Sequence, residues 1–136
     1  MVSRVQDAER ILLLLDYDGT VAPIQDHPSL AYPDASVRNA LAAIASDFWE
    51  DLSDEKPPRI VAGILSGRAL DDVRRRTCFS EFAYSGNYGL EIDAFGRKYI
   101  NPDADARRDQ LAGICRQIAD ATDSIPGAFI ENKGLT

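Results

Sequence analysis

The fold is decided by residues 11–20, which read ILLLLDYDGT. The apolar run from Ile11 to Leu15 favours a strand that is buried on both faces, as strands of parallel sheets are. Asp16 and Asp18 follow this strand directly, and Gly19 permits a tight turn after them. In open α/β sheets, functional residues lie at the carboxyl ends of strands. We therefore expect a parallel α/β sheet with a site beside Asp16.

The next segments continue an alternation of strands and helices. Asp34 can cap a helix whose apolar stripe runs from Val37 to Phe48. Residues 59–65 resemble a second buried strand, residues 66–76 a short basic helix, and residues 82–85 a third strand. This order favours a parallel sheet with right-handed crossovers.

The pattern changes after residue 87. Residues 88–92 and 98–100 predict the two strands of a hairpin. A helix with one apolar face is expected to follow, and then a strand over residues 128–131. We predict a core over residues 1–100 and the beginning of a small α+β cap domain over residues 101–136.

Composition excludes several function classes. The formal net charge of −7 argues against a nucleic-acid or membrane surface, since both partners are anionic. The longest apolar run is too short to cross a bilayer or to form a secretory signal. Cys78 and Cys115 lack metal-type spacing, which favours buried thiols in a reducing cytosol. The single His27 cannot support a histidine-rich zinc site.

Asp16 and Asp18 are the first candidate site residues. Two carboxylates at one strand end are costly unless something compensates their charge. Mg²⁺ is suited to this role because it prefers oxygen ligands and often binds phosphate as well. The backbone N–H groups of the turn at Gly19 and Thr20 can also receive an anion. The alternative is a solvated turn, because Asp and Gly are common turn residues.

Ser66, Gly67 and Arg68 form the second candidate group. A hydroxyl at a strand end, followed by glycine and a helix N-terminus, is a suitable phosphate site. Ser66 could instead be only a helix cap. Arg68 could contact either a substrate or the carboxylates near Asp16, and Arg74, Arg75 and Arg76 suggest a solvated helix end.

Residues 15–21 resemble the first motif of the haloacid dehalogenase superfamily of phosphatases. The resemblance implies that Asp16 attacks phosphorus and that Asp18 protonates the leaving oxygen and then activates water. It also implies Mg²⁺ on the Asp16 carboxylate and the Asp18 backbone carbonyl. Thr20 would help to hold the loop, and Ser66 would bind the transferred phosphoryl group.

Three further stretches resemble trehalose-6-phosphate phosphatases, so that the similarity covers almost the whole chain. They are residues 21–28, residues 85–91, where Tyr88 replaces the family's histidine, and residues 126–133, which match a Pro-Gly-x-x-x-Glu-x-Lys pattern. The resemblance implies Mg²⁺-dependent hydrolysis of trehalose 6-phosphate. Residues that could bind the sugar are Arg68, Asn87, Glu91, Glu131 and Lys133, although the last two could form only a surface ion pair.

The family pattern continues beyond Thr136 with a lysine and an acidic metal-binding motif. We therefore expect a truncated chain with weak activity. Its first strand would have a bare edge that could pair with another copy or swap segments. Alternatives are hydrolysis of sucrose phosphate or mannosylglycerate phosphate, a non-catalytic phosphatase-like domain, and a phosphoacceptor domain without turnover.

Overall fold

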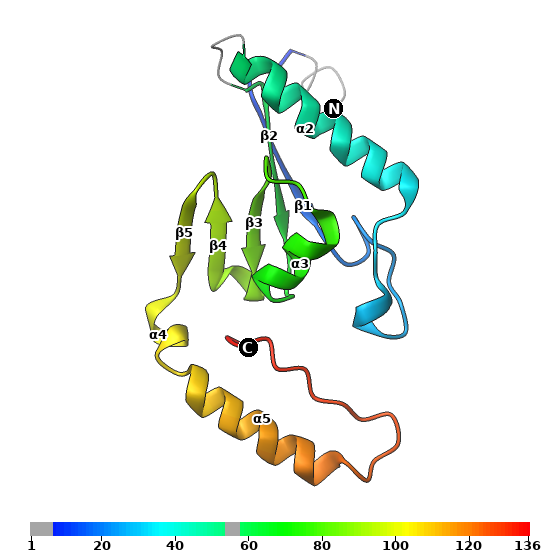
Figure 1. Cartoon of the computed structure of the whole chain (residues 1–136), viewed down its shortest axis with the longest axis vertical. Helices are drawn as coiled ribbons and strands as arrows, with labels where there is room; N and C mark the ends of the chain where they lie inside the picture. Colours follow the sequence, from blue (N-terminus) through cyan, green and yellow to red (C-terminus); the bar gives the residue numbers. More distant parts are fainter. Residues whose placement is uncertain (1–6, 54–57) are drawn as a thin grey trace.

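The computed structural model describes residues 7–53 and 58–136. One five-stranded sheet, in the order β1-β2-β3-β4-β5, forms its centre (Figure 1). Neighbouring strands of the first three are parallel, whereas the last two pairings are antiparallel. The strand, helix, strand, helix, strand order expected from the sequence is confirmed. The strands are β1 Ile11–Asp16, β2 Ile60–Leu65, β3 Ala83–Gly86, β4 Glu91–Ala94 and β5 Arg97–Ile100.

β1 is less buried than its sequence predicts. It lies at the edge of the sheet, with β2 as its paired neighbour. Leu12 and Leu14 on one face are 68% and 49% exposed, whereas Leu15 packs against the core. The expectation of burial on both faces is therefore wrong for the described structure, because the described elements cover only one face of this strand.

Helix α2, Ala35–Ser53, begins where the sequence predicts. The Asp34 Oδ1 atom accepts a hydrogen bond from the Val37 amide at 2.9 Å, which confirms the predicted cap. Leu41 and Ala45 of α2 enter the core with Tyr17 and Ile64. This packing covers one face of the parallel strands.

Helix α3, Leu70–Thr77, begins four residues later than Ser66, where the sequence analysis placed its start. Its first turn lies directly on the end of β3. A Cβ atom on Gly86 would lie 2.4 Å from the Leu70 nitrogen, so this approach requires glycine. The residues between β2 and α3 are therefore a loop, which leaves Ser66 and Gly67 outside the helix.

The β4–β5 hairpin is tighter than expected. Its turn uses Phe95 and Gly96, with φ angles of 52° and 80°, as a two-residue hairpin turn requires. Tyr88 lies outside the hairpin, in the short 3-10 helix η2 Asn87–Gly89. The predicted first strand of the hairpin therefore begins three residues later, at Glu91.

The last quarter of the chain extends below the sheet. Helices α4 Pro102–Asp105 and α5 Arg108–Thr122 lead away, and the remaining segment returns beneath the carboxyl ends of β2 and β3 (Figure 1). The predicted strand over residues 128–131 is wrong, since this segment is irregular and no described strand pairs with it. The Phe129 ring instead lies 4.9 Å from the ring of His27, which precedes the 3-10 helix η1 Pro28–Leu30.

The two cysteines differ in their burial. Cys78 is exposed and Cys115 is half-buried, so the predicted burial of both thiols is wrong for Cys78, which ends α3 at the surface.

Within the described ranges, no helix has the length and apolar character needed to cross a membrane.

Candidate active site

Two neighbouring cavities open at the carboxyl ends of the parallel strands. The first, of about 450 Å³, lies between the strand ends and the C-terminal segment. The second, of about 440 Å³, lies toward the end of β3. Asp16, Gly67 and Tyr88 line both. The first is also lined by Asp18, Ile24, Gln25, Pro28, Ala31, Arg68, Glu131 and Lys133, and the second by Leu65, Ser66, Ser85 and Gly89.

Asp16 occupies the tip of β1 and is exposed. Within residues 7–53 and 58–136, no group donates a hydrogen bond to its carboxylate or forms an ion pair with it. A carboxylate in this state is available to attack an electrophile or to bind a cation. The structure therefore brings the predicted nucleophile to the wall that the two cavities share.

The loop after Asp16 is held by its own backbone. Tyr17 is fully buried, and its hydroxyl donates to the Ala31 carbonyl oxygen at 2.9 Å. Burial raises the pKa of this phenol, which therefore remains a donor. The amides of Val21 and Ala22 donate to the Tyr17 carbonyl oxygen at 3.0 and 2.8 Å. These contacts hold the loop after Asp16 against the end of the 3-10 helix η1, where Ala31 is the C-cap.

Gly19 and Thr20 stabilise the same loop through hydrogen bonds of their backbone amides. The Gly19 amide donates to the Ala22 carbonyl oxygen at 2.7 Å, and the φ angle of 89° at this residue favours glycine. The Thr20 amide donates to the Tyr17 carbonyl oxygen at 3.4 Å. Neither residue lines either cavity, so their phosphate contacts stay predictions.

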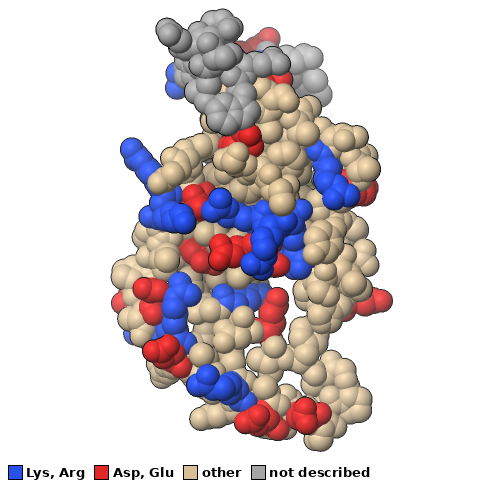
Figure 2. Space-filling model, viewed as in Figure 1, with Lys and Arg blue, Asp and Glu red and all other residues tan. Residues whose placement is uncertain are grey.

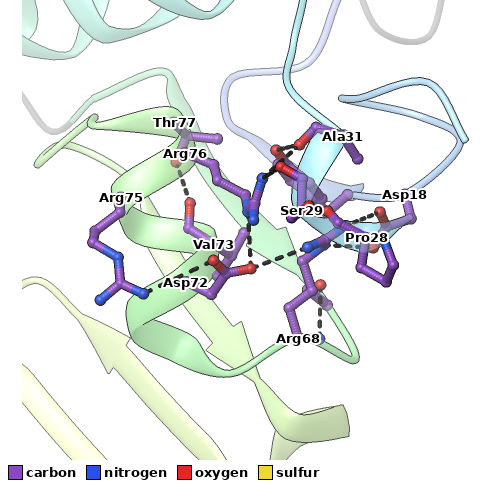
Figure 3. Close-up of polar contacts among 12 residues, drawn as sticks. Asp18, Pro28, Ser29, Ala31, Arg68, Asp72, Val73, Arg75, Arg76 and Thr77 are labelled. Carbon is purple, nitrogen blue, oxygen red and sulfur yellow. Dashed lines mark hydrogen bonds and ion pairs between the residues drawn. The ribbon is translucent and has the colours of Figure 1, made fainter. Parts of the chain in front are cut away.

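Asp18 is held by Arg68 from the loop before α3 (Figure 3). Arg68 Nε donates to Asp18 Oδ2 at 2.9 Å, and Nη2 donates to Oδ1 at 2.7 Å. The same Nη2 donates to the Pro28 carbonyl oxygen at 2.9 Å. This two-point contact fixes both oxygens of the carboxylate. Of the two partners that the sequence allowed for Arg68, the structure shows the carboxylate.

Asp72 extends this pair into a partly buried network. Its Oδ2 atom accepts hydrogen bonds from Arg68 Nη1 at 3.0 Å and from Arg76 Nε at 2.8 Å. Burial would raise the pKa of Asp72, but the hydrogen bonds from Arg76 and Arg68 outweigh it and hold this pKa below its usual range. Burial lowers the pKa of Arg68, and its bonds to Asp18 and Asp72 more than reverse that effect.

The arginines of α3 differ in their surroundings. Figure 2 shows basic and acidic side chains interleaved across the middle of this face of the molecule, where α3 lies in Figure 1. The Arg75 side chain is 74% exposed, as a solvated helix end predicts. Arg76 is only 8% exposed and donates to the Ala31 carbonyl oxygen, so that prediction is wrong for Arg76. Arg74 pairs with Asp93 of β4.

Ser66 directly follows β2 and is itself buried. Its Oγ atom accepts a hydrogen bond from the Arg68 amide at 3.1 Å, and the residue lines the second cavity. The N-cap of α3 is Ala69, so Ser66 is not the helix cap considered from the sequence. Its hydroxyl proton remains available for a ligand beside Asp16.

Asn87 and Glu91 lie behind the cavities. Glu91 Oε1 accepts hydrogen bonds from the Leu70 amide and from Asn87 Nδ2, both at 2.7 Å. Asn87 is fully buried; it also donates to the Lys133 carbonyl oxygen at 3.1 Å and accepts from Thr136 Oγ1 at 2.8 Å. Neither side chain lines a cavity, so their sugar contacts stay predictions.

Glu131 and Lys133 complete the first cavity from the C-terminal segment. Lys133 Nζ lies 3.5 Å from Glu131 Oε2, and both residues line the cavity. They reach it without the predicted strand. The ion pair considered as an alternative is therefore present, and it lies at the site.

The donor set fits a weakly held Mg²⁺. No group of three or more His, Cys, Asp or Glu residues is arranged for a metal in the described part of the chain. Mg²⁺ commonly keeps several waters and is held by one or two carboxylates together with phosphate. Asp16 has a free carboxylate, whereas Arg68 holds both carboxylate oxygens of Asp18. In this arrangement the Asp18 backbone carbonyl is the better metal ligand.

Sequence reasoning missed the roles of Tyr17, Asp72 and Arg76. For two of them a signal existed, since Arg68, Asp72 and Arg76 are spaced by four residues, the spacing that pairs charges on the helix expected over residues 66–76. Tyr17 had no comparable signal, because its partner Ala31 lies 14 residues away.

Comparison with known proteins identifies a family. The trehalose-phosphatase family model matches residues 14–136. A trehalose-phosphate phosphatase of Mycobacterium avium (strain 104) is 33% identical over 122 residues, covering 89% of this chain and 28% of that protein. A probable trehalose-phosphate phosphatase J of Arabidopsis thaliana is 29% identical, with 92% and 33% covered. The chain thus spans about a third or less of these relatives.

Solved structures agree with the fold. The C-terminal domain of the C. albicans trehalose-6-phosphate phosphatase matches with a TM-score of 0.71 at 22% identity, over 95% of this chain and 42% of that chain. A trehalose-6-phosphate phosphatase related protein matches with a TM-score of 0.68 at 23% identity, over 90% and 48%. These likenesses confirm the predicted α/β fold, which this chain shares with solved trehalose-6-phosphate phosphatases.

Proposed function

Because this chain belongs to the trehalose-phosphatase family, we propose that it carries the nucleophile and the acid–base residue of a site that hydrolyses trehalose 6-phosphate. One observation carries the proposal. Asp16 presents to the cavities a carboxylate that no other described residue engages, and Asp18, two residues later, is held at both oxygens by Arg68. A free carboxylate beside a fixed one suits two different roles in one reaction.

The proposed reaction has two steps. An Asp16 carboxylate oxygen attacks phosphorus and the bond from phosphorus to the sugar oxygen breaks. Asp18 donates a proton to that oxygen, and for this step one Asp18 oxygen must first leave Arg68 and take up a proton from solvent. Asp18 then takes a proton from water, whose oxygen attacks the aspartyl-phosphate and releases inorganic phosphate. Mg²⁺ on the Asp16 carboxylate and the Asp18 carbonyl would supply positive charge that lets one anion approach another.

Other residues would bind rather than react. The Ser66 hydroxyl lies at the second cavity and would donate to a phosphoryl oxygen, with the adjoining Gly67 as part of the same wall. Glu131 and Lys133 would hydrogen-bond sugar hydroxyls in the first cavity. Asn87 and Glu91 support this wall from behind, and a direct sugar contact by either requires the C-terminal segment to move.

The same proposal includes the division of the chain into a core and a cap. Residues 1–100 form the core and residues 101–136 begin a cap, in a cytoplasmic enzyme. The edge position of β1 and the exposure of Leu12 and Leu14 support pairing of this strand with another copy or segment. Light scattering should then give a mass above one chain, or a mass that rises with concentration; a monomer at every concentration would contradict pairing between copies.

The experiment that tests the function measures phosphate release and phosphorylation of the chain. We expect Mg²⁺-dependent release from trehalose 6-phosphate in preference to sucrose phosphate and mannosylglycerate phosphate, weak for this chain alone. Mass spectrometry should find one acid-stable phosphate on Asp16. Asp16→Asn should abolish both signals, whereas Asp71→Asn, on an exposed residue of α3, should leave them unchanged. Undiminished release by Asp16→Asn would contradict the proposal.

A further inference from the structure

Tyr88 combines an unusual backbone with an exposed aromatic ring. Its φ angle is 56° and that of Asn87 is 48°, so two consecutive residues other than glycine are left-handed. Such backbone costs free energy and persists where the surrounding structure enforces it, often at functional sites. Tyr88 is nevertheless 78% exposed, so burial of its ring in the core does not offset that cost.

The surrounding contacts enforce this conformation. The Asn87 amide donates to the Arg68 carbonyl oxygen at 2.7 Å, and the Tyr88 amide donates to the Ser66 carbonyl oxygen at 3.1 Å. The buried Asn87 side chain is fixed by Glu91 and by the C-terminal segment. The turn is therefore tied to the loop that follows β2, and the Tyr88 ring is directed toward that loop.

The ring lies at the wall between the two cavities. A Cβ atom on Gly67 would lie 2.5 Å from Tyr88 Cζ, so the ring rests on bare glycine backbone. Tyr88 lines both cavities together with Asp16, and Lys133 Nζ lies 5.9 Å from the ring centre. The ring therefore has the proposed nucleophile and the charged pair of the C-terminal segment as neighbours.

We propose that Tyr88 is a stacking platform for the sugar ring of the substrate and thereby a specificity-determining residue. This inference rests on the proposed function. Sugar rings present apolar C–H groups on their faces and hydroxyls around their edges. An aromatic ring beside a few polar groups matches both surfaces, because the ring covers the apolar face while Glu131 and Lys133 reach the hydroxyls. A small phosphate ester without a sugar would gain nothing from the platform.

The first test compares substrates in Tyr88→Asn and Tyr88→Phe. Asparagine removes the ring but tolerates a left-handed backbone, and phenylalanine keeps the ring. We expect Tyr88→Asn to lower the ratio of kcat/KM for trehalose 6-phosphate to that for acetyl phosphate by about three- to tenfold. Tyr88→Phe should keep most of the ratio. Tyr99→Thr, which removes an exposed aromatic ring from β5, should keep all of it. An unchanged ratio in Tyr88→Asn would overturn the inference.

The second test uses Gly67→Ala, whose added methyl group must displace the ring. If the ring is the platform, Gly67→Ala should lower the same ratio in the parent protein and have little further effect in Tyr88→Asn. If the effects of Gly67→Ala and Tyr88→Asn on the ratio simply add, Gly67→Ala does not act through the Tyr88 ring, and the inference is overturned.

Binding of unphosphorylated trehalose separates this inference from the proposed function. Titration with trehalose, followed by NMR of the tyrosine rings, should shift the Tyr88 signal. If the protein releases phosphate from neither ester, the proposed function fails while this shift still tests the platform. A Tyr88 signal that stays unchanged at saturating trehalose would overturn the platform.

Discussion

Two walls of the first cavity differ in how they are held. The sheet wall, residues 16–18 with 66–68, is held by the Arg68 network and by backbone bonds of the loop after β1. The C-terminal wall, residues 131–136, has no regular structure. It is attached through the buried Leu135 and through the hydrogen bonds that the Asn87 side chain makes with Lys133 and Thr136. This difference suits chemistry on a rigid support and substrate recognition on an adaptable one.

The largest effect should come from breaking the sheet wall at Arg68. Arg68→Met leaves Asp18 and Asp72 without their shared partner. Loss of one member of a buried ion pair costs about 3–5 kcal/mol, and we expect the lower end, about 3 kcal/mol, because the Asp18 and Asp72 side chains are 43% and 25% exposed. Urea denaturation should show a loss of that size, and activity should fall as Asp18 loses its position. Arg68→Lys should recover only part of each, because lysine cannot make the two-point contact.

Arg75→Met is the matched control for Arg68→Met. Arg75 is also an arginine close to Asp72, but its side chain is 74% exposed, against 6% for that of Arg68. Its removal should change the free energy of unfolding by less than about 0.5 kcal/mol. Similar losses in the two variants would show that the network does not hold this wall.

The next effect should come from Asn87, which joins the two walls. Asn87→Asp keeps the size and the tolerance of left-handed backbone, but it replaces the donor to Glu91 and to the Lys133 carbonyl with a second negative charge. We expect a loss of about 2 kcal/mol at neutral pH, partly recovered in acid. Hydrogen exchange should accelerate in residues 131–136 before it does in β2.

Asn39→Asp introduces the same charge at an exposed position of α2 and serves as the control. It should leave the stability and the exchange of residues 131–136 as they are. If Asn87→Asp destabilises the sheet and the C-terminal wall equally, the two walls are one cooperative unit and the contrast between them is wrong.

A smaller effect should appear in the pH dependence of the sheet wall. Hydrogen bonds from Arg76 and Arg68 outweigh burial and lower the pKa of Asp72 in the folded protein. A lowered folded pKa means that the stabilisation is complete above the unfolded pKa, about 3.9, and is lost as pH falls through the folded pKa. The difference in unfolding free energy between the parent protein and Asp72→Asn should be constant from pH 7 to 5 and shrink below about pH 4. Shrinkage already between pH 7 and 5 would contradict this.

Sequence patterns predicted the sheet wall better than the C-terminal wall, for a physical reason. The run before Asp16 and the cap at Asp34 are local signals, and each can be recognised within one element. The Asp18–Arg68 pair spans 50 residues, so its geometry depends on the packing of β1 against β2. Its components were nevertheless visible as two motifs at the ends of neighbouring strands.

The C-terminal wall could not be predicted in the same way. Residues 128–131 have strand-forming composition, but a strand requires a paired neighbour, and this segment pairs neither with the free edge of β1 nor with that of β5. The exposure of Leu12 and Leu14 has a similar cause, because burial depends on what covers a face and not on the run itself. The positive φ angles at Asn87 and Tyr88 had no sequence signal beyond the asparagine.

The smallest effect should come from the C-terminal wall itself. Lys133→Met removes a charge that is held by one ion pair of 3.5 Å, so unfolding should be unchanged within error. Loss of its contact with substrate should raise KM for trehalose 6-phosphate about three- to fivefold with little change in kcat, since a contact made equally in the bound and transition states affects binding alone. Lys98→Met, which removes an exposed lysine from β5, is the control and should alter neither constant. A fall in kcat with constant KM would place Lys133 with the reacting groups, and recognition and chemistry would then no longer divide between the two walls.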